Sequence, residues 1–267
     1  MQVAALQFDI VWEDKAANFC KVEELLEAAH LEADTLLVLP EMFATGFSMD
    51  TGKIAENYGE VTEQFLAALA KKFGIYVVAG AAMKGRDGQP RNKALVFSPA
   101  GELIALYAKM KPFTPGGESS NYIAGKSPII FRWADFKIAP FICYDLRFPE
   151  LFRKAAASDR PELFTVIASW PDKRSQHWVT LLQARAIENQ AYVIGVNRIG
   201  KDPYFSYAGR SLIIDPSGNI LADAGDEQKC IQATVDMGNL RKYRQGLPFL
   251  EDLSNSNDDD EIRIFPN

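Results

Sequence analysis

The sequence predicts an α/β fold in which strands and helices alternate along one continuous domain. Short apolar runs of the kind that form buried strands recur from residues 2–8 to residues 230–235. Segments with apolar side chains at helical spacing separate many of these runs, and turn residues join others into hairpins. Because no stretch of changed composition interrupts this pattern, we expect residues 1–253 to form a single domain and residues 254–267 an acidic tail.

The first part of the chain supplies three expected strands and two expected helices. The pattern predicts strands at residues 2–8, 35–39 and 76–80, and the second of these is an uninterrupted apolar run typical of a strand buried on both faces. Apolar side chains at helical spacing predict helices at residues 18–31 and near residues 61–73.

A hairpin and a long loop are expected in the middle of the chain. Residues 93–98 and 102–109 flank a turn at residues 99–101, whose sequence Pro-Ala-Gly predicts a hairpin. Residues 111–127 are rich in glycine and proline and are too many for a simple connection. Because loops of this length usually carry function, we expect part of a site here.

The alternation continues in the second half of the chain. An apolar strand ends at Cys143, and Pro149 with Glu150 predicts the start of a helix, because proline at the first helical position loses no hydrogen bond. A strand at residues 163–168 precedes a helix at residues 176–190. The remaining strands are expected at residues 192–197, 211–214, 219–222 and 230–235, with a hairpin turn at residues 215–218.

Composition excludes several classes of function. The net charge is -6 and the basic residues are scattered among acidic ones, so no basic stripe is available to bind nucleic acid. No apolar run approaches the length of a membrane span, and the amino terminus does not resemble a signal peptide. Three widely spaced cysteines without a C-x-x-C pair indicate reduced thiols in the cytoplasm, and two histidines are too few for an attractive zinc site, so we expect no metal or other cofactor.

Three residues with catalytic chemistry stand at the ends of expected strands. Glu41 follows the strand at residues 35–39, Lys109 ends the second strand of the hairpin, and Cys143 ends a third strand. In α/β proteins ligands bind in the crevice outside the carboxyl ends of strands, so an acid, an amine and a thiol meet there if these strands are neighbours. Taken singly, each has a structural explanation, because such residues are usually solvated loop residues or, for cysteine, small core residues.

Three motifs around these residues carry a resemblance to a known family. They are LPEMF at residues 39–43, YAKMKPF at residues 107–113 and ICYDLRFPE at residues 142–150. In this order they resemble the catalytic motifs of the nitrilase superfamily of carbon-nitrogen hydrolases, and the likeness extends to about Leu240. The resemblance implies a four-layer α-β-β-α sandwich, usually assembled as a homodimer or larger oligomer, and a catalytic role for Cys143.

The resemblance also implies a role for each residue of the site. Cys143 matches the family's nucleophile and Glu41 its general base. Lys109 as an ammonium and the backbone N–H of Tyr144 are expected to stabilise the oxyanion, and losing one such donor typically costs about 3 kcal/mol of barrier. Glu118 matches a second glutamate that holds the lysine in place, and its carboxylate would keep Lys109 charged.

Two positions carry residues that the family motif or the expected strand would not normally have. Lys111 stands where the family often has histidine and competes with Lys109 for the catalytic role, but Pro112 beside it indicates a loop rather than a strand end. Pro140 falls inside the strand before Cys143, where an interior position would normally need an N–H donor. In carrying a proline at this position, the chain resembles bacterial omega-amidase-like members of the superfamily.

The segment after the strand at residues 163–168 predicts the substrate class. SWPDKR at residues 169–174, with HW at residues 177–178, resembles the omega-amidase-like branch, which hydrolyses the terminal amide of short dicarboxylic acid monoamides such as 2-oxoglutaramate and 2-oxosuccinamate. A substrate carboxylate favours a planar donor fork, which Arg174 can supply, although a solvated loop arginine is an equal explanation. The expected pocket walls, each of which is alternatively a core residue, are Phe43, Trp170 and Tyr207.

Other functions stay open at this point. A non-catalytic binding module would be indicated by loss of a catalytic residue, but Glu41, Lys109 and Cys143 are all present. A Cys-His hydrolase would need His177 near Cys143. Within the superfamily, hydrolysis of nitriles, of N-carbamoyl amino acids and of deaminated glutathione are the alternatives to the omega-amidase prediction.

Overall fold

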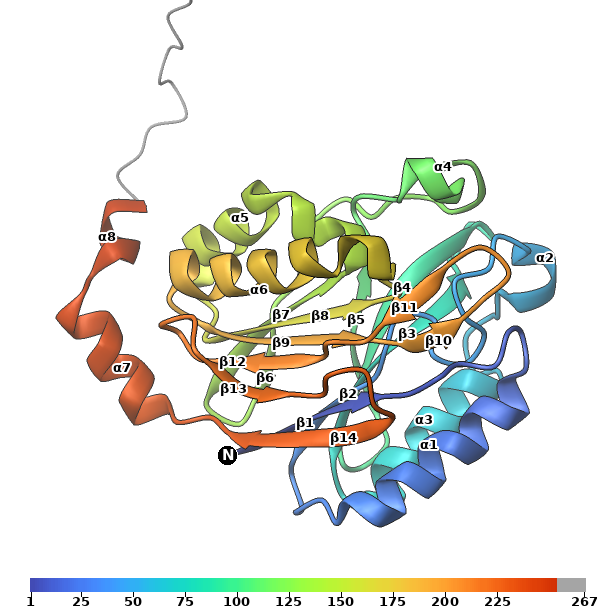
Figure 1. The fold of residues 1–267 in the computed structure, drawn as a ribbon, viewed down its shortest axis with the longest axis horizontal. Helices are drawn as coiled ribbons and strands as arrows, with labels where there is room; N and C mark the ends of the chain where they lie inside the picture. The colour runs from blue at the N-terminus through green and yellow to red at the C-terminus, as the bar shows by residue number, and fades with distance from the viewer. Residues whose placement is uncertain (254–267) are drawn as a thin grey trace, which may run out of the picture.

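Two six-stranded sheets lie face to face between two pairs of helices (Figure 1). The computed structural model describes residues 1–253, so the tail expected at residues 254–267 lies outside the described residues. One hydrophobic cluster fills the space between the sheets and continues beneath the helices of the second sheet, and another lies under the helices of the first sheet. The predicted α/β fold class, a four-layer α-β-β-α sandwich, is confirmed.

The first sheet has the strand order β14, β1, β2, β3, β4, β5. Alternate side chains of β1 (Gln2–Gln7) point to opposite faces, so Val3 and Ala5 pack in the core between the sheets, whereas Ala4 and Leu6 pack beneath the helices. The other elements of these two layers are β2 (Leu36–Val38), β3 (Tyr76–Lys84), β4 (Pro90–Phe97), β5 (Leu103–Ala108), β14 (Lys229–Thr234), α1 (Lys15–Ala29) and α3 (Val61–Phe73).

The second sheet has the strand order β13, β12, β9, β8, β7, β6. Its three central strands are parallel, are buried on both faces and lie beneath a pair of helices (Figure 1). The elements of these layers are β6 (Phe131–Trp133), β7 (Phe136–Ile142), β8 (Leu163–Ala168), β9 (Tyr192–Asn197), β12 (Leu212–Ile214), β13 (Ile220–Asp223), α5 (Pro149–Asp159) and α6 (Ser175–Asn189).

Parallel pairing collects the carboxyl ends of neighbouring strands at one edge of each sheet. In the first sheet β1, β2 and β3 are parallel, and in the second sheet β7, β8 and β9 are parallel. Glu41 follows β2, Cys143 follows β7 and Ser169 follows β8. Residues that are far apart in the sequence therefore meet where the two sheets end.

Most predicted elements are confirmed, but some have different limits. Helix α1 begins at Lys15 rather than at residue 18, because the side chain of Asp14 accepts a hydrogen bond from the Ala17 N–H at 3.0 Å and caps the helix. Strand β3 continues beyond Gly80 as far as Lys84, because β4 pairs with it along its length. In each case a capping or pairing partner, rather than the hydrophobic pattern, sets the limit.

Several elements were not predicted from the sequence. Strand β6 and the hairpin of β10 with β11 consist of three-residue strands, which are too short to show a period. Two helices follow the last strand, where the sequence pattern predicts no element. The remaining bounds are α2 (Thr51–Ile54), α4 (Glu118–Asn121), β10 (Ile199–Lys201), β11 (Ser206–Ala208), α7 (Met237–Gly246) and α8 (Phe249–Leu253).

The pairing of β7 explains how the strand tolerates Pro140. Strand β6 pairs with β7 only as far as Ile138, whereas β8 pairs with β7 up to Ile142. Within residues 1–253, Pro140 therefore lies where β7 has a neighbouring strand on one side only. Proline is found in sheets mainly at such positions, where the strand lacks a partner on one side.

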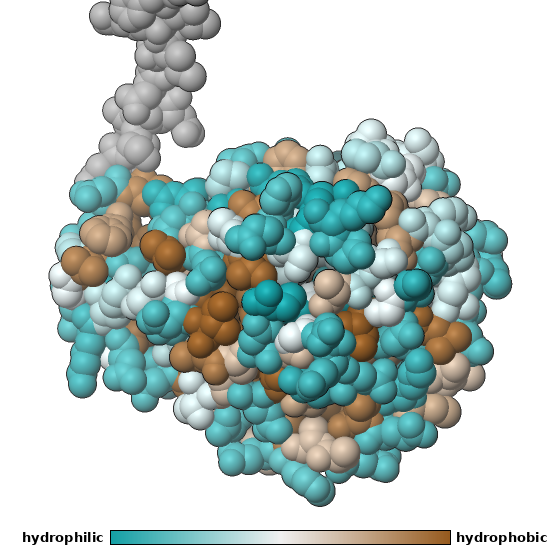
Figure 2. All heavy atoms as spheres, in the orientation of Figure 1, coloured by the Kyte–Doolittle hydropathy of each residue, from teal (hydrophilic) through white to brown (hydrophobic). Residues whose placement is uncertain are grey.

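The surface mixes hydrophilic and hydrophobic residues. Figure 2 shows hydrophilic residues over most of the visible face, with hydrophobic residues in small groups between them. None of the helices within residues 1–253 is long and apolar enough to cross a membrane.

Candidate active site

A buried lysine between two glutamates forms the centre of the site. Lys109 follows β5, Glu41 follows β2, and Glu118 begins α4 inside the loop that was expected to carry function. The Lys109 ammonium donates hydrogen bonds to Glu41 Oε1 at 2.8 Å and to Glu118 Oε2 at 2.7 Å. Burial opposes the charge on Lys109, but the carboxylates of Glu118 and Glu41 outweigh it and hold the lysine pKa well above its usual range. The lysine is therefore an ammonium at neutral pH.

Cys143 lies on the turn between β7 and α5. It is the first residue of the 3₁₀ helix η2 (Cys143–Arg147), and its φ of 48° is in the left-handed region that residues other than glycine seldom adopt. Burial raises the pKa of the Cys143 thiol well above its usual range, and the charge of Glu41 raises it further, whereas Lys109 opposes the shift. The thiol is therefore protonated at neutral pH and needs a base before it can act as a nucleophile.

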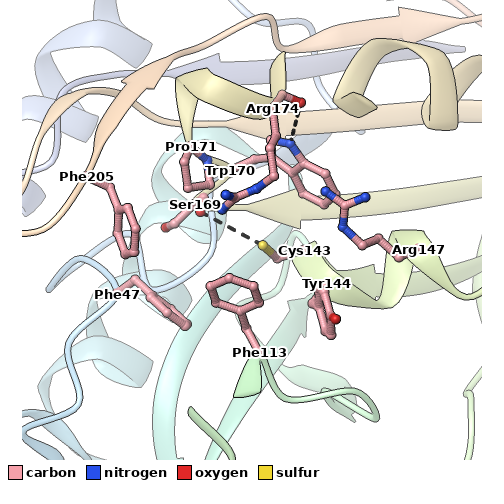
Figure 3. Close-up of a pocket in the computed structure, with 10 residues that line it drawn as sticks. All are labelled: Phe47, Phe113, Cys143, Tyr144, Arg147, Ser169, Trp170, Pro171, Arg174 and Phe205. Atoms are coloured by element: carbon pink, nitrogen blue, oxygen red, sulfur yellow. Dashed lines mark hydrogen bonds between the residues drawn. The ribbon is translucent and has the colours of Figure 1, made fainter. Parts of the chain in front are cut away.

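A pocket opens beside the thiol (Figure 3). Aromatic rings form much of its wall, and two arginine side chains reach into it, Arg174 toward Cys143 and Arg147 beside the Trp170 ring. Such a lining can hold a small molecule that carries a negative charge. The lining residues are Phe47, Phe113, Cys143, Tyr144, Arg147, Ser169, Trp170, Pro171, Arg174 and Phe205.

The family of the chain follows from comparison with known proteins. Residues 2–245 match the carbon-nitrogen hydrolase family. The chain belongs to this family. This hydrolase is 35% identical to the 2-oxoglutaramate amidase of Bacillus subtilis, over 94% of this chain and 96% of that one, and 35% identical to the omega-amidase YafV of Escherichia coli strain K12, over 99% of each.

Two further similarities bear on fold and function. A carbon-nitrogen hydrolase superfamily protein from Xanthomonas campestris, whose structure contains an arsenic adduct in the active site, has a TM-score of 0.89 and 30% identity over 99% of each chain. The deaminated glutathione amidase of Synechocystis is 35% identical to this hydrolase, over 88% of this chain and 91% of that one.

Two of the predicted substrate-binding residues line the pocket of this hydrolase, and two lie elsewhere. Trp170 and Arg174 are part of the lining. Phe43 instead packs in the core beneath α1 and α3, with its ring centroid 6.1 Å from that of Phe65. Tyr207 is buried against the Arg198 guanidinium and donates a hydrogen bond to Asp202. The prediction erred here because an aromatic residue near a motif can face the core as easily as the pocket.

Neither alternative catalytic residue, Lys111 or His177, lines the pocket beside the thiol. The Lys111 side chain is 39% exposed and its ammonium lies 3.9 Å from the Glu150 carboxylate. His177 is exposed, and its Nδ1 lies 3.2 Å from an Arg147 nitrogen. Among the described residues, His, Cys, Asp and Glu side chains form no group of three or more that could hold a metal ion.

Several residues of the site were not predicted from the sequence, among them Ser169, Asn92 and Arg147. The Ser169 N–H donates to Glu41 Oε2 at 2.8 Å, and the side-chain amide of Asn92 donates to both glutamates of the cluster. Arg147 could have been found, because it lies four residues after Cys143 within the motif at residues 142–150. Ser169 belongs to the segment at residues 169–174, but the sequence does not indicate that it or Asn92 contacts a glutamate, because these hydrogen bonds join residues 26 to 128 positions apart.

Asp145 fixes the backbone on both sides of the thiol. Its carboxylate accepts hydrogen bonds from the Tyr107 hydroxyl at 2.7 Å, from the Lys111 N–H at 2.8 Å and from the Ile142 N–H at 3.0 Å. Burial raises the pKa of Asp145 to about 6, although the Tyr107 hydrogen bond opposes the shift. This carboxyl therefore joins the lysine segment to the turn that holds Cys143.

Proposed function

We propose that this enzyme hydrolyses the terminal amide of short dicarboxylic acid monoamides, of the 2-oxoglutaramate or 2-oxosuccinamate type, to a carboxylate and ammonia. The observation that carries the proposal is the pair of guanidinium groups in the pocket that opens onto Cys143. The names of the Bacillus subtilis and Escherichia coli relatives support the same substrate class.

The reaction proceeds through a thioester on Cys143. Glu41 takes the thiol proton as the sulfur attacks the amide carbon, and the carbonyl oxygen becomes an oxyanion. The Lys109 ammonium and the Tyr144 N–H stabilise this oxyanion; Tyr144 is in the first turn of η2, where N–H groups have no partner within the helix. Glu41 then passes the proton to the amide nitrogen, the carbon-nitrogen bond breaks and ammonia leaves.

Water completes the turnover. Glu41 removes a proton from a water molecule as its oxygen attacks the thioester carbon, and the second oxyanion collapses to release the acid product. The proton held by Glu41 returns to the sulfur, which restores the thiol. Glu118 contributes by holding the Lys109 ammonium in place and charged.

The two arginines supply a site for the substrate's carboxylate. The Arg147 guanidinium lies 4.7 Å from the centre of the Trp170 ring, and that of Arg174 lies 5.6 Å from the centre of the Phe113 ring. Burial and the neighbouring charge of Arg174 lower the pKa of Arg147. An anion between these guanidinium groups relieves their mutual repulsion, and each can bind a carboxylate with two parallel hydrogen bonds.

Hydrolysis of deaminated glutathione is the second candidate. It is favoured by the 35% identity to the Synechocystis relative, and it would use the same thiol, base and oxyanion site. The two candidates differ in the leaving group, which is ammonia for the monoamides and the amine of a dipeptide for deaminated glutathione, so relative kcat/KM values for 2-oxosuccinamate, 2-oxoglutaramate, deaminated glutathione and an N-carbamoyl amino acid decide between them.

Replacing Arg174 tests the carboxylate site. A hydrogen bond to a charged group contributes about 1.5 to 3 kcal/mol, so Arg174→Ala should lower kcat/KM for 2-oxosuccinamate by roughly ten- to more than a hundredfold. A neutral amide of similar size should change little, because the lost contact lies away from the reacting carbon. Arg174→Lys should restore part of the loss, since lysine lacks the two-pronged fork.

Lys173 provides a matched control for this experiment. It carries the same charge on the neighbouring position but is exposed and does not line the pocket. Lys173→Ala should therefore leave both kcat/KM values close to those of the wild type. An equal loss for charged and neutral amides in Arg174→Ala would show that Arg174 supports the loop rather than binds the substrate.

Cytoplasmic location and homodimer formation remain predictions. The former is supported by the three cysteines, all of which are free thiols, and the latter by the resemblance to the superfamily. Cell fractionation and sedimentation of the purified protein test them.

A further inference from the structure

Asn92 occupies a position in the site to which the proposed chemistry assigns no role. It lies near the start of β4, opposite Ala82 of β3, and is 2% exposed. Its Nδ2 donates hydrogen bonds to Glu41 Oε1 at 2.6 Å and to Glu118 Oε1 at 2.8 Å. The amide therefore links the same two carboxylates that the Lys109 ammonium links.

The orientation of the Asn92 amide follows from these partners. If Nδ2 and Oδ1 were exchanged, the amide oxygen would face two carboxylate oxygens without a proton between them. In the observed orientation Oδ1 is a buried acceptor with no hydrogen-bond partner within residues 1–253. A buried unpaired acceptor is costly, so the fold leaves one atom unsatisfied in order to direct both N–H groups at the glutamates.

The charges of the cluster show why these donors matter. Glu41 and Glu118 together carry two negative charges when ionised, and Lys109 carries one positive charge. Burial and the like charges of the two carboxylates both favour uptake of a proton, whereas hydrogen bonds donated to the charged form oppose it. Asn92 opposes proton uptake at both carboxylates because it donates one hydrogen bond to each.

We infer that Asn92 is a positioning residue that keeps Glu41 ionised and fixed for removing the proton from Cys143. When the Lys109 ammonium donates to the oxyanion, its hydrogen bonds to the glutamates are shared or lost, and Asn92 then remains as a link between them. This role rests on the proposed function of Glu41 as the base but not on the identity of the amide substrate.

Other groups facing the glutamates come from several elements. The Ser169 N–H after β8 donates to Glu41, and the Phe113 N–H donates to Glu118 at 2.6 Å. The titratable groups whose charges interact with the glutamates are Lys109 after β5, Tyr122 after α4, Cys143 after β7 and Tyr207 of β11. Burial raises the pKa of both tyrosines well above their usual range, so near neutral pH they stay uncharged and do not replace Asn92 in balancing the carboxylates.

The test replaces Asn92 by leucine, which is similar in size and donates no hydrogen bond. Without the two donors a proton binds the carboxylates more readily, so the acid limb of the kcat/KM profile should move to higher pH. Each hydrogen bond to a charged group is equivalent to about one to two pH units, so we expect a displacement of this order. The rate at which iodoacetamide alkylates Cys143 should show the same displacement, because Glu41 also accepts the thiol proton in that reaction.

Two further variants make the test specific. Asn92→Thr keeps one donor in its hydroxyl group, so its acid limb should lie between those of the wild type and Asn92→Leu. Asn189 is a matched control, because it is 1% exposed, its Oδ1 also lacks a partner among the described residues, and its amide donates within α6. Asn189→Leu should alter thermal stability but leave both pH profiles unchanged.

The two readouts separate this inference from the proposed function. An unchanged acid limb for alkylation and for kcat/KM in folded Asn92→Leu, whatever the loss of kcat, would show that Asn92 only supports the fold. If Asn92→Leu does not fold, the position of the acid limb in Asn92→Thr decides the question. If the expected amides are not substrates, the alkylation profile still tests Asn92, because it requires no turnover.

Discussion

At the scale of single residues, Cys143 differs from the other two cysteines in its backbone, its surroundings and its access to a base. Its left-handed φ is a conformation that costs a residue other than glycine of order 1 kcal/mol or more and that is often retained at functional sites. Cys20 is exposed, and burial raises the pKa of Cys230 to about 12. Of the three thiols, only Cys143 lines the pocket beside the glutamate and lysine pair.

Replacement of the three cysteines tests this difference. Cys143→Ala should abolish amide hydrolysis and leave the fold intact, because it removes the nucleophile but only one atom from the core. Cys20→Ala and Cys230→Ala should be nearly silent. Mass spectrometry of the intact wild-type protein with a slow substrate should detect an acyl group on Cys143. A tenth of wild-type turnover in Cys143→Ala, or an acyl group on another cysteine, contradicts the thioester mechanism.

At the scale of elements, β3 determines where Glu41 lies. Strand β3 lies beside β2 and the turn that follows it, and the Phe43 N–H donates to the Gly80 carbonyl oxygen at 3.2 Å. A Cβ atom on Gly80 would lie 2.6 Å from Glu41 Cα and 2.6 Å from the Met42 backbone nitrogen. Because both contacts are with backbone atoms, a side chain at Gly80 would force the turn that carries the base to move.

Gly80→Ala should therefore reduce activity more than its small change in volume suggests. Displacement of a catalytic group by about 1 Å can reduce the rate roughly a hundredfold, and strain in a packed region typically costs about 1 to 3 kcal/mol of stability. Gly246→Ala is the matched control, because a Cβ at that position meets no atom within 4 Å. Comparison of kcat and of urea unfolding for the two variants tests this expectation, which fails if Gly80→Ala retains wild-type kcat.

At the scale of the whole molecule, the site depends on how the two sheets dock. Tyr107 belongs to β5 of the first sheet, whereas Asp145 follows β7 of the second sheet. The hydrogen bond from the Tyr107 hydroxyl to Asp145 joins these sheets next to both Lys109 and Cys143. The distance between the amine and the thiol is thus coupled to the packing of the entire sandwich.

Asp145 should make stability depend on pH. Its pKa in the folded protein, about 6, exceeds the ordinary value of 3.8, so the folded state binds the proton more tightly than the unfolded state does. The resulting stabilisation is present below pH 4 and is lost as the pH rises through about 6, an effect of ~3 kcal/mol. Asp145→Asn removes this titration, so the free energy of unfolding of the wild type relative to the variant should fall by most of this amount from pH 4 to pH 7.

Urea unfolding at several pH values measures this difference. A difference between wild type and Asp145→Asn that does not vary with pH would show that the folded-state pKa of Asp145 is not raised.

The sequence by itself determined the order of the longer elements, the α/β class and the motifs that bring Glu41, Lys109, Glu118 and Cys143 to strand ends or loops. These features depend on local properties, namely the period of apolar residues and the conformations that proline and glycine favour, so they can be seen within a short window of the chain. For the same reason helix α3 was predicted with its observed limits, Val61–Phe73.

Only the tertiary structure decided which side chains face one another across the site. Asn92 and Glu41 are 51 positions apart, and Ser169 and Glu41 are 128 positions apart, so no local spacing predicts their hydrogen bonds. Phe43 lies in the turn after β2, where no period shows which apolar surroundings a buried side chain enters, and for that reason it was predicted in the pocket but lies in the outer core. The register of the strands and the docking of the two sheets set these contacts, because they alone fix which distant residues become neighbours.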